Sequence, residues 1–241
     1  GLKGHKENTE ALGFSERMKK MFHMKEKFAE IPEKEVLTEI LQSDMENIRG
    51  TMESLDKDAF SMAAELIQNA KKIYIVGIRS CEPLADFLGF YLNMLFDEVH
   101  VVRTNSASEI FEQLMRIGAG DVLIGISFPK YSMRTVKAME LANSRSAGVI
   151  SITDSIHSPL NLYSSCNLIA RSEMASVVDS LTAPLSVINA LIVALCLKNQ
   201  DSLKQSIETL DQLYDDYQIY GRDEMDPSGG EIEIFHQGSR V

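Results

Sequence analysis

Hydroxyl groups and single positive charges lie together in short segments of this chain, each directly after an apolar run. Ile73–Val76 is followed by Gly-Ile-Arg-Ser-Cys-Glu, and Val122–Ile126 is followed by Ser-Phe-Pro-Lys-Tyr-Ser. A third run, Val149–Ile152, is followed by Thr-Asp-Ser. The candidate ligand-binding residues in these three segments are Arg79, Ser80, Cys81, Ser127, Lys130, Tyr131, Ser132 and Asp154.

These residue types suit an anionic ligand. Free backbone N–H groups and the positive end of a following helix favour negative charge. Hydroxyl groups add directional donors, and Arg79 or Lys130 adds charge. Each feature also has an ordinary structural explanation, since a serine before a helix is often only an N-cap and Arg79 can pair with Glu82 or Asp86. The three segments together predict a site for a small phosphorylated polyol.

The elements that must position these residues are short strands separated by helix-length segments. The apolar runs are rich in Val and Ile and end in polar residues or glycine, a pattern typical of strands buried on both faces. They are Ile73–Val76, Val99–Val102, Val122–Ile126, Val149–Ile152 and Leu168–Ala170. Alternating strands and helices predict a three-layer α/β/α domain with a five-stranded parallel sheet. Ligands bind beyond the carboxyl ends of such strands, where the candidate residues lie.

Apolar residues at three- and four-residue steps predict the helices. Pro32 and Asp56 mark the beginnings of the first two. The predicted ranges are 33–50, 56–70, 82–96, 106–118, 131–145, 180–198 and 202–218. Segment 180–198 is apolar nearly all round, so we expect it to be partly buried and partly packed on another copy of the chain, in a dimer or tetramer. The alternation over Glu231–Phe235 predicts a short added strand.

Composition limits the classes of partner. The chain has 241 residues and a formal net charge of −11, so its main surface is unsuited to nucleic acid. Residues 1–30 alone are net basic, with seven Lys or Arg against five Asp or Glu. The three cysteines show no zinc spacing and suit a reducing compartment. The apolar stretch Leu181–Leu197 is interrupted by polar residues and Pro184, and it falls short of the about 20 residues that a membrane span needs. With no signal peptide apparent, we expect a cytoplasmic protein.

Other chemistries compete with the anion site. A dinucleotide site is disfavoured, because the first segment has Gly77 alone and the second strand ends at Arg103 instead of an acidic residue. The G-x-S-x-G elbow of the α/β hydrolases is absent. An isomerase stays open as an alternative, since proton transfer needs a carboxylate and ring opening benefits from a histidine. Glu173 and His157 are the candidates for that pair, and Glu109 is a further carboxylate near a strand end.

The strand-end segments resemble the loops of the sugar isomerase (SIS) domain family, over residues 56–200 approximately. Ser-Phe-Pro-Lys-Tyr-Ser, and Asp179-Ser-Leu-Thr-Ala-Pro-Leu ahead of the long apolar helix, more narrowly resemble the effector domain of RpiR-type transcriptional regulators. Glu10-Ala-Leu-Gly-Phe-Ser and Met18-Lys-Lys-Met-Phe are similar to the last part of the helix-turn-helix domain that precedes the SIS domain in those regulators.

Both loops of this chain depart from the sequence patterns that are common in the family. Many SIS domains carry G-x-G-x-S in the first loop, where Arg79 here takes the second glycine and Ser80 or Cys81 takes the serine. The second loop is often S-x-S-G-x-T; here Ser127 and Ser132 match its first and last positions, while Pro129 and Lys130 replace the Ser-Gly pair. We expect direct charge pairing by Arg79 and Lys130 to offset the lost backbone flexibility and the lost hydroxyl group.

The resemblance further implies a domain organisation and a function. Residues 1–30 would be the end of a DNA-binding domain, 31–55 a linker helix, 56–220 the SIS domain with flavodoxin-like strand order, and 221–241 a tail. The implied protein is a cytoplasmic, dimerising sensor of a sugar phosphate. It is expected to have no catalytic activity, cofactor or metal, and to contact DNA only through helices outside this chain.

Overall fold

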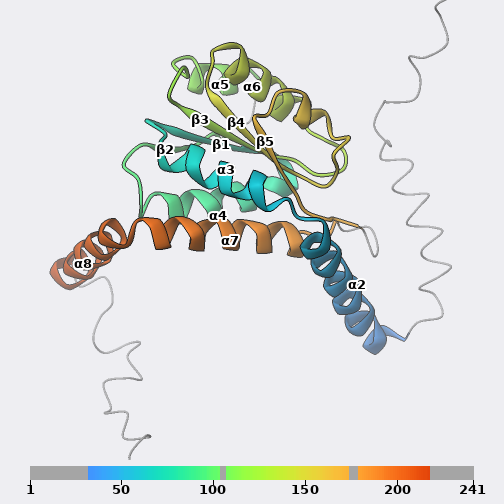
Figure 1. Ribbon diagram of the computed structural model, residues 1–241. Helices are drawn as coiled ribbons and strands as arrows, with labels where there is room; N and C mark the ends of the chain where they lie inside the picture. Colours follow the sequence, from blue (N-terminus) through green and yellow to red (C-terminus); the bar gives the residue numbers. More distant parts are fainter. Residues whose placement is uncertain (1–31, 104–106, 174–178, 218–241) are drawn as a thin grey trace, which may run out of the picture.

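The computed structural model describes residues 32–103, 107–173 and 179–217. Among these residues five parallel strands form a single sheet in the order β2-β1-β3-β4-β5, which is the predicted flavodoxin-like order (Figure 1). The strands are β1 (Ile73–Gly77), β2 (Val99–Val101), β3 (Val122–Ile126), β4 (Gly148–Thr153) and β5 (Cys166–Ile169). The predicted fold class is therefore confirmed, and each strand lies within two residues of its predicted range.

Helices cover both faces of the sheet, as Figure 1 shows. α3, α4 and α7 pack on one face, and α5 and α6 pack on the other. The helices are α2 (Glu33–Ser54), α3 (Lys57–Gln68), α4 (Glu82–Leu92), α5 (Ala107–Gln113), α6 (Met133–Ser144), α7 (Thr182–Lys198) and α8 (Gln200–Tyr217). Two short 3-10 helices, η1 (Arg79–Cys81) and η2 (Pro159–Leu162), follow β1 and β4. The strand predicted at Glu231–Phe235 lies outside the described residues.

Two apolar clusters, one on each face, hold the three layers together. Side chains alternate along β1, so Ile73 and Ile75 join the cluster beneath α3, α4 and α7, whereas Tyr74 and Val76 join the cluster beneath α5 and α6. Every residue of β1 and β3 is buried, as a central parallel strand requires. The same expectation is wrong for β2, where His100 is exposed, because this strand forms an edge of the sheet.

Two helices project from the body of the domain. α2 protrudes beyond one end of α7, and α8 turns away at the other end (Figure 1). In the described ranges no single helix is long and apolar enough to cross a membrane; α7 and α8 reach that criterion only as a pair, and they are bent by 97° at their junction. Asp56 caps α3 as predicted, since its side chain accepts hydrogen bonds from the backbone N–H groups of Asp58 and Ala59.

Candidate functional site

The first strand-end loop turns sharply at Gly77. A Cβ atom there would lie 2.4 Å from the carbonyl oxygen of Cys81, so only glycine allows the chain to fold back so closely. Arg79 follows with a φ of 60°, a left-handed conformation that glycine adopts without strain and arginine rarely adopts. Arg79 and Ser80 are exposed at the carboxyl edge of the sheet. The loop therefore presents a cation and a hydroxyl group to solvent.

The second loop repeats this backbone feature. Lys130 has a φ of 74° and is half-buried, shortly before α6 begins. The Ser127 hydroxyl accepts a hydrogen bond of 3.0 Å from the backbone N–H of Ser132. This hydrogen bond joins the first and last residues of the loop. Arg79 and Lys130 thus share a left-handed backbone conformation that glycine adopts without strain.

A side-chain network ties the second loop to the end of β4. The Tyr131 hydroxyl donates to Asp154 Oδ1 at 2.8 Å, and the Thr153 hydroxyl donates to Ser158 Oγ at 2.9 Å and contacts the same Asp154 oxygen at 3.3 Å. Burial and the adjacent Asp154 carboxylate raise the pKa of Tyr131 far above its ordinary value. Tyr131 is therefore a neutral donor at physiological pH, and it fixes the Asp154 carboxylate in place.

The first and second loops meet at Cys81. This residue is buried, and its thiol forms hydrogen bonds with the Phe128 backbone and the Ser80 side chain. Burial raises the pKa of the Cys81 thiol, so it stays protonated at physiological pH. The predicted residues thus fall into two groups. Six are exposed or half-buried at the carboxyl edge of the sheet: Arg79, Ser80, Lys130, Tyr131, Ser132 and Asp154. The other two, Cys81 and Ser127, are buried.

The ordinary structural explanations of these side chains do not hold. Ser132 occupies the N-cap position of α6, but its side chain makes no capping hydrogen bond. Asp86 pairs with Arg103 at 2.9 Å instead of with Arg79. Among the described residues Arg79 forms no ion pair. The Ser132 hydroxyl is thus left without a capping role and the Arg79 guanidinium without a carboxylate partner.

A second polar cluster, which the sequence did not reveal, joins α2 to the segment after β5. The Asn47 side chain donates to the Glu173 carbonyl at 3.0 Å and accepts from the Glu173 N–H at 3.1 Å, so it pairs with that backbone as a neighbouring strand would. Thr51 Oγ1 accepts from the Arg171 N–H at 2.8 Å. Asn47 and Thr51 are both buried. The carboxyl-terminal half of α2 is therefore fastened to the edge of the sheet that carries the candidate site.

The same cluster extends to the beginning of α7. The two carboxylate oxygens of Asp44 accept hydrogen bonds from Ser180 at 2.6 Å and from Thr182 at 3.0 Å. Ser180 and Thr182 therefore link α2 to the beginning of α7. No sequence pattern predicts these hydrogen bonds, because the residues that they join lie more than 120 positions apart in the chain.

The candidate isomerase residues follow two different strands, His157 after β4 and Glu173 after β5. His157 and Glu173 are both exposed, and within the described residues no hydrogen bond or ion pair joins their side chains. Arg171 approaches Glu173 at 3.8 Å, a loose surface pair. Glu109 lies in the first turn of α5. In the part of the chain that the structure describes, no group of three His, Cys, Asp or Glu side chains is placed to hold a metal ion.

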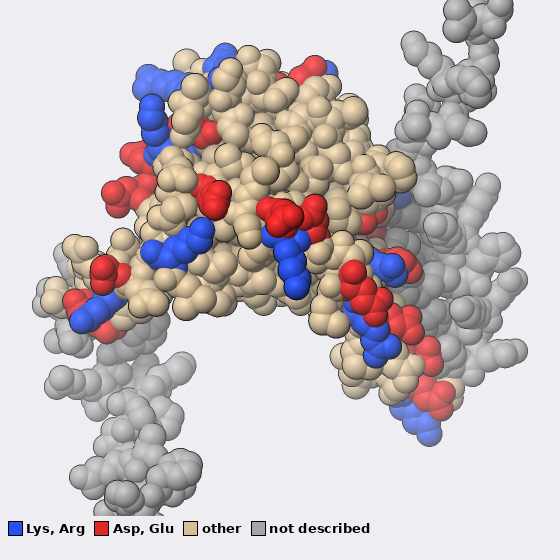
Figure 2. Space-filling view, viewed as in Figure 1, with Lys and Arg blue, Asp and Glu red and all other residues tan. Residues whose placement is uncertain are grey.

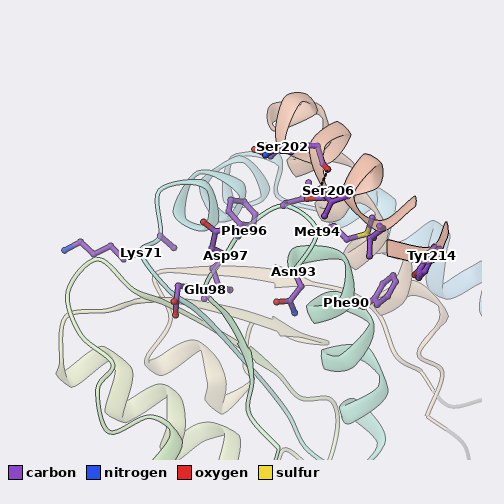
Figure 3. Close-up of a pocket in the computed structure, with 16 residues that line it drawn as sticks. Lys71, Phe90, Asn93, Met94, Phe96, Asp97, Glu98, Ser202, Ser206 and Tyr214 are labelled. Carbon is purple, nitrogen blue, oxygen red and sulfur yellow. Dashed lines mark hydrogen bonds between the residues drawn. The ribbon is translucent and has the colours of Figure 1, made fainter. Parts of the chain in front are cut away.

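A hollow of about 900 Å³ lies at the opposite edge of the sheet (Figure 3). Phe90 of α4 and Met94, which follows the end of α4, face Tyr214 of α8 across it, and Lys71 and Glu98, which precede β1 and β2, lie at its rim. None of the predicted ligand-binding residues lines it. The hollow is therefore distinct from the strand-end site, which lies at the carboxyl edge where ligands of open parallel sheets bind.

Comparisons with known proteins agree with this geometry. The model of the SIS domain family matches residues 66–194. Two curated relatives, an uncharacterised HTH-type transcriptional regulator of Caldanaerobacter subterraneus and the HTH-type transcriptional regulator HexR of Escherichia coli, are each 27% identical. The matches cover 74% and 75% of this chain and 64% of either relative, so the chain spans less than two thirds of the length of the relatives it matches.

Solved structures show the same fold. The sugar isomerase domain of an RpiR transcription factor from Sphaerobacter thermophilus is similar with a TM-score of 0.71 and 24% identity, over 74% of this chain and 99% of that one. Vibrio vulnificus NanR, solved with ManNAc-6P, has a TM-score of 0.65 and 18% identity, over 78% and 72%. The phosphoheptose isomerase GmhA of Neisseria gonorrhoeae has a TM-score of 0.57 and 18% identity, over 67% and 97%. Regulators and an enzyme thus share this architecture.

Proposed function

Because the chain belongs to the SIS domain family, we propose that it is the phosphosugar-sensing, dimerising effector domain of an RpiR-like transcriptional regulator. The phosphate would bind at the strand ends, where Arg79 or Lys130 supplies charge. The hydroxyl groups of Ser80, Ser127 and Ser132 would supply directional donors. Cys81, Tyr131 and Asp154 would hold the two loops in place beneath the ligand. DNA would be contacted through a part of the protein that precedes this chain.

The observation that carries the proposal is the left-handed backbone of Arg79 and Lys130. A left-handed non-glycine residue costs about 1–2 kcal/mol, so the fold tolerates it only where the loop shape is required. Both residues are cations, and both lie in loops whose glycine-bearing versions cradle phosphate in many SIS domains. Arg79 and Lys130 would supply positive charge from two strand-end loops, which is what an anion site needs.

The hydrogen bonds between α2 and the segments beside β5 and α7 support the sensing role. The segment after β5 and the beginning of α7 both bond to α2, so a ligand that shifts either segment would also shift α2. α2 leads directly into the amino-terminal part of the chain, where the end of a DNA-binding domain is expected. A ligand acts in this way only if it binds two arrangements with different affinity.

Regulator relatives favour a sensor over an enzyme. We place the protein in the cytoplasm, where sugar phosphates are formed. The outward face of α7 supports the dimer: Val193 and Leu197 are exposed although the helix carries no charge before Lys198.

A thermal-shift panel tests the proposal. Hexose, pentose and amino-sugar phosphates, ManNAc-6-phosphate among them, would be compared with the corresponding free sugars and with sulfate. A ligand that binds only the folded state raises the melting temperature, by an amount that reaches about 2.7 kcal/mol of stability at a hundredfold excess over its Kd. We expect a shift with one phosphorylated sugar and none with its free sugar. A turnover assay on that compound, with Glu173→Gln as control, separates the sensor from an isomerase. Turnover that Glu173→Gln abolishes would overturn the sensor reading.

A further inference from the structure

The outer edge of β2 carries backbone groups that no described residue pairs. Since β2 is the last strand on one side of the sheet, only β1 lies beside it. The Glu98 carbonyl and the Val102 N–H both bond to β1, at 2.9 Å each. Backbone groups alternate in direction along a strand, so the N–H and C=O groups of Val99 and Val101 point away from β1. They form an open edge at which a further strand can pair.

Apolar side chains beside this edge are incompletely buried on the α4 face of the sheet. Val99 and Val101 point to that face and are half-buried. A Cβ atom on Gly89 of α4 would lie 2.2 Å from Val101 Cγ2, so the helix and the strand are in contact there. The next residue of α4, Phe90, is 64% exposed. Apolar side chains of an added strand would extend the apolar cluster over this surface.

The opposite face of the edge is polar. His100 is exposed there, stacks on Tyr74 with 5.1 Å between the ring centroids, and contacts Glu98 at 3.1 Å. Figure 2 shows positive and negative side chains together on the side of the molecule where β2 lies, at the left of the view. A strand that carries carboxylates on this face therefore meets no surface of purely negative charge. The edge suits a strand in which apolar and charged residues alternate.

The segment Glu231–Phe235 of the same chain has this alternation. Its sequence is Glu-Ile-Glu-Ile-Phe, and two glycines precede it, which is typical of a turn that leads into a strand. In a strand, its two isoleucines fall on one face, and its two glutamates fall on the other together with Phe235. This pattern matches the apolar and polar faces of the β2 edge.

The chain leaves the described structure close to the beginning of this edge. Tyr214, in the last turn of α8, lines the same hollow as Phe90 and Glu98, the residue before β2 (Figure 3). Thirteen residues, 218–230, then precede Glu231. An extended chain of that length spans up to about 45 Å, enough to pass along the hollow and reach β2. A tethered segment also has an effective concentration on the order of mM, which favours it over the same segment of a second copy.

We propose that residues 231–235 add to the sheet as a further strand beside β2 of their own chain, with the isoleucines on the α4 face and the glutamates on the face of His100. The backbone of this strand forms hydrogen bonds with Val99 and Val101, as an extended peptide does when it joins the edge of a sheet. Its isoleucines cover the apolar surface beside α4. The pairing needs no ligand and does not depend on the sensing function.

Amide hydrogen exchange, resolved to single residues, tests this pairing. The Val99 and Val101 amides of the full chain are compared with those of a chain that ends at Gly230. We expect removal of residues 231–241 to speed exchange at both amides by about tenfold or more, because the tethered strand no longer protects them. The His100 amide faces β1 in both chains and should exchange at the same rate. Equal exchange of Val99 and Val101 in the two chains would overturn the proposal.

Two neighbouring substitutions test which face of the added strand is apolar. Ile234→Lys places a charge on the α4 face and should speed the exchange of the Val99 and Val101 amides as the truncation does. Glu233→Lys is the matched control, because it places the same side chain on the solvated face and should leave both amides protected. Equal effects of the two substitutions, or a larger effect of Glu233→Lys, would contradict the proposed orientation.

Dilution separates pairing within one chain from pairing with a second copy. Protection by the chain's own segment is independent of protein concentration, whereas pairing between copies weakens on dilution. We expect the Val99 and Val101 amides to exchange at constant rates over about a hundredfold range of protein concentration. Protection that is lost on dilution would assign the edge to another copy and overturn the intrachain strand. All samples are free of sugar phosphate, so a failure here is distinguishable from a failure of the sensing function.

Discussion

Replacing Arg79 by glycine separates the strain of the first strand-end loop from its charge. Arg79 and Ser146 both have a φ of 60°, and both are exposed. Ser146 lies between α6 and β4, at the edge of the sheet remote from the candidate site. Arg79→Gly and Ser146→Gly therefore relieve the same backbone strain, but only the first removes a cation from the site.

The expected magnitudes differ for stability and for ligand binding. Relief of the left-handed conformation contributes about 1–2 kcal/mol, and the extra freedom of glycine in the unfolded chain costs about 0.5–1 kcal/mol. Each variant should therefore be up to about 1.5 kcal/mol more stable than the wild type, a rise in Tm of about 3–6 °C at most for a domain of this size. A charge-assisted hydrogen bond to phosphate contributes about 1.5–3 kcal/mol, so Arg79→Gly should weaken sugar-phosphate binding about 10- to 100-fold.

Thermal melts without ligand and calorimetric titrations with the sugar phosphate from the panel measure the two effects. Arg79→Ala completes the set, because it removes the charge and keeps the strain. We expect it to lose as much affinity as Arg79→Gly without the gain in Tm. The reasoning is refuted if Arg79→Gly binds the sugar phosphate as tightly as the wild type, or if it melts several degrees below Ser146→Gly.

The hydrogen bonds and the pKa shifts lead to three further predictions. Asn47→Ala removes both hydrogen bonds to the Glu173 backbone and leaves that backbone unpaired, so chemical denaturation should show a loss of about 1–3 kcal/mol. Tyr131→Phe should weaken sugar-phosphate binding in a titration, because it frees Asp154 to move, and it should cost about 0.5–1.5 kcal/mol of stability. Burial raises the pKa of Cys166 to about 11 in the folded chain, against an ordinary value of 9.0. The folded state then holds the proton more tightly, so stability is fully present below pH 9 and falls as the pH rises toward 11; denaturation at a series of pH values measures this, and Cys166→Ala should flatten the curve.

Each of these predictions has its own control or contradicting result. Glu46→Ala changes an exposed neighbour of Asn47 and should leave stability within about 0.5 kcal/mol of the wild type. A loss equal to that of Asn47→Ala would contradict the role given to the backbone pairing. For Tyr131, unchanged affinity in the phenylalanine variant would show that Asp154 needs no anchor. For Cys166, an identical alkaline slope in the alanine variant would assign the loss to other groups.

The strands were accessible from the sequence because a strand buried in a parallel sheet is a short, continuous run of Val and Ile, whereas their order followed from the resemblance to the SIS family. Ile73–Gly77 and Val122–Ile126 are runs of this kind. Asp56 indicated the beginning of α3, because aspartate is a favoured N-cap residue. The sequence did not indicate that β2 lies at an edge of the sheet, because its three residues, Val-His-Val, are compatible with a central strand and with an edge strand.

The finer features of the site depend on contacts that a linear pattern does not encode. Nothing in the residues Asn47 and Thr51 indicates that they bond to a segment more than 100 positions away. The left-handed backbone of Arg79 and Lys130 is equally hidden, because neither residue type favours it; only the glycine positions of the resembling loops pointed to it. The bend of 97° between α7 and α8, which shapes the hollow of Figure 3, likewise arises from packing and has no proline at the junction.

Calorimetric titration of the wild-type protein with one sugar phosphate and with its free sugar tests the central claim most directly. The account predicts saturable binding of the phosphorylated compound, and an affinity for the free sugar that is lower by at least about tenfold, since the phosphate makes charge-assisted hydrogen bonds at the strand ends. Equal affinity for the two compounds, or no binding of any phosphorylated sugar in the panel, would contradict the claim that Arg79, Lys130 and the neighbouring serines form a phosphosugar site.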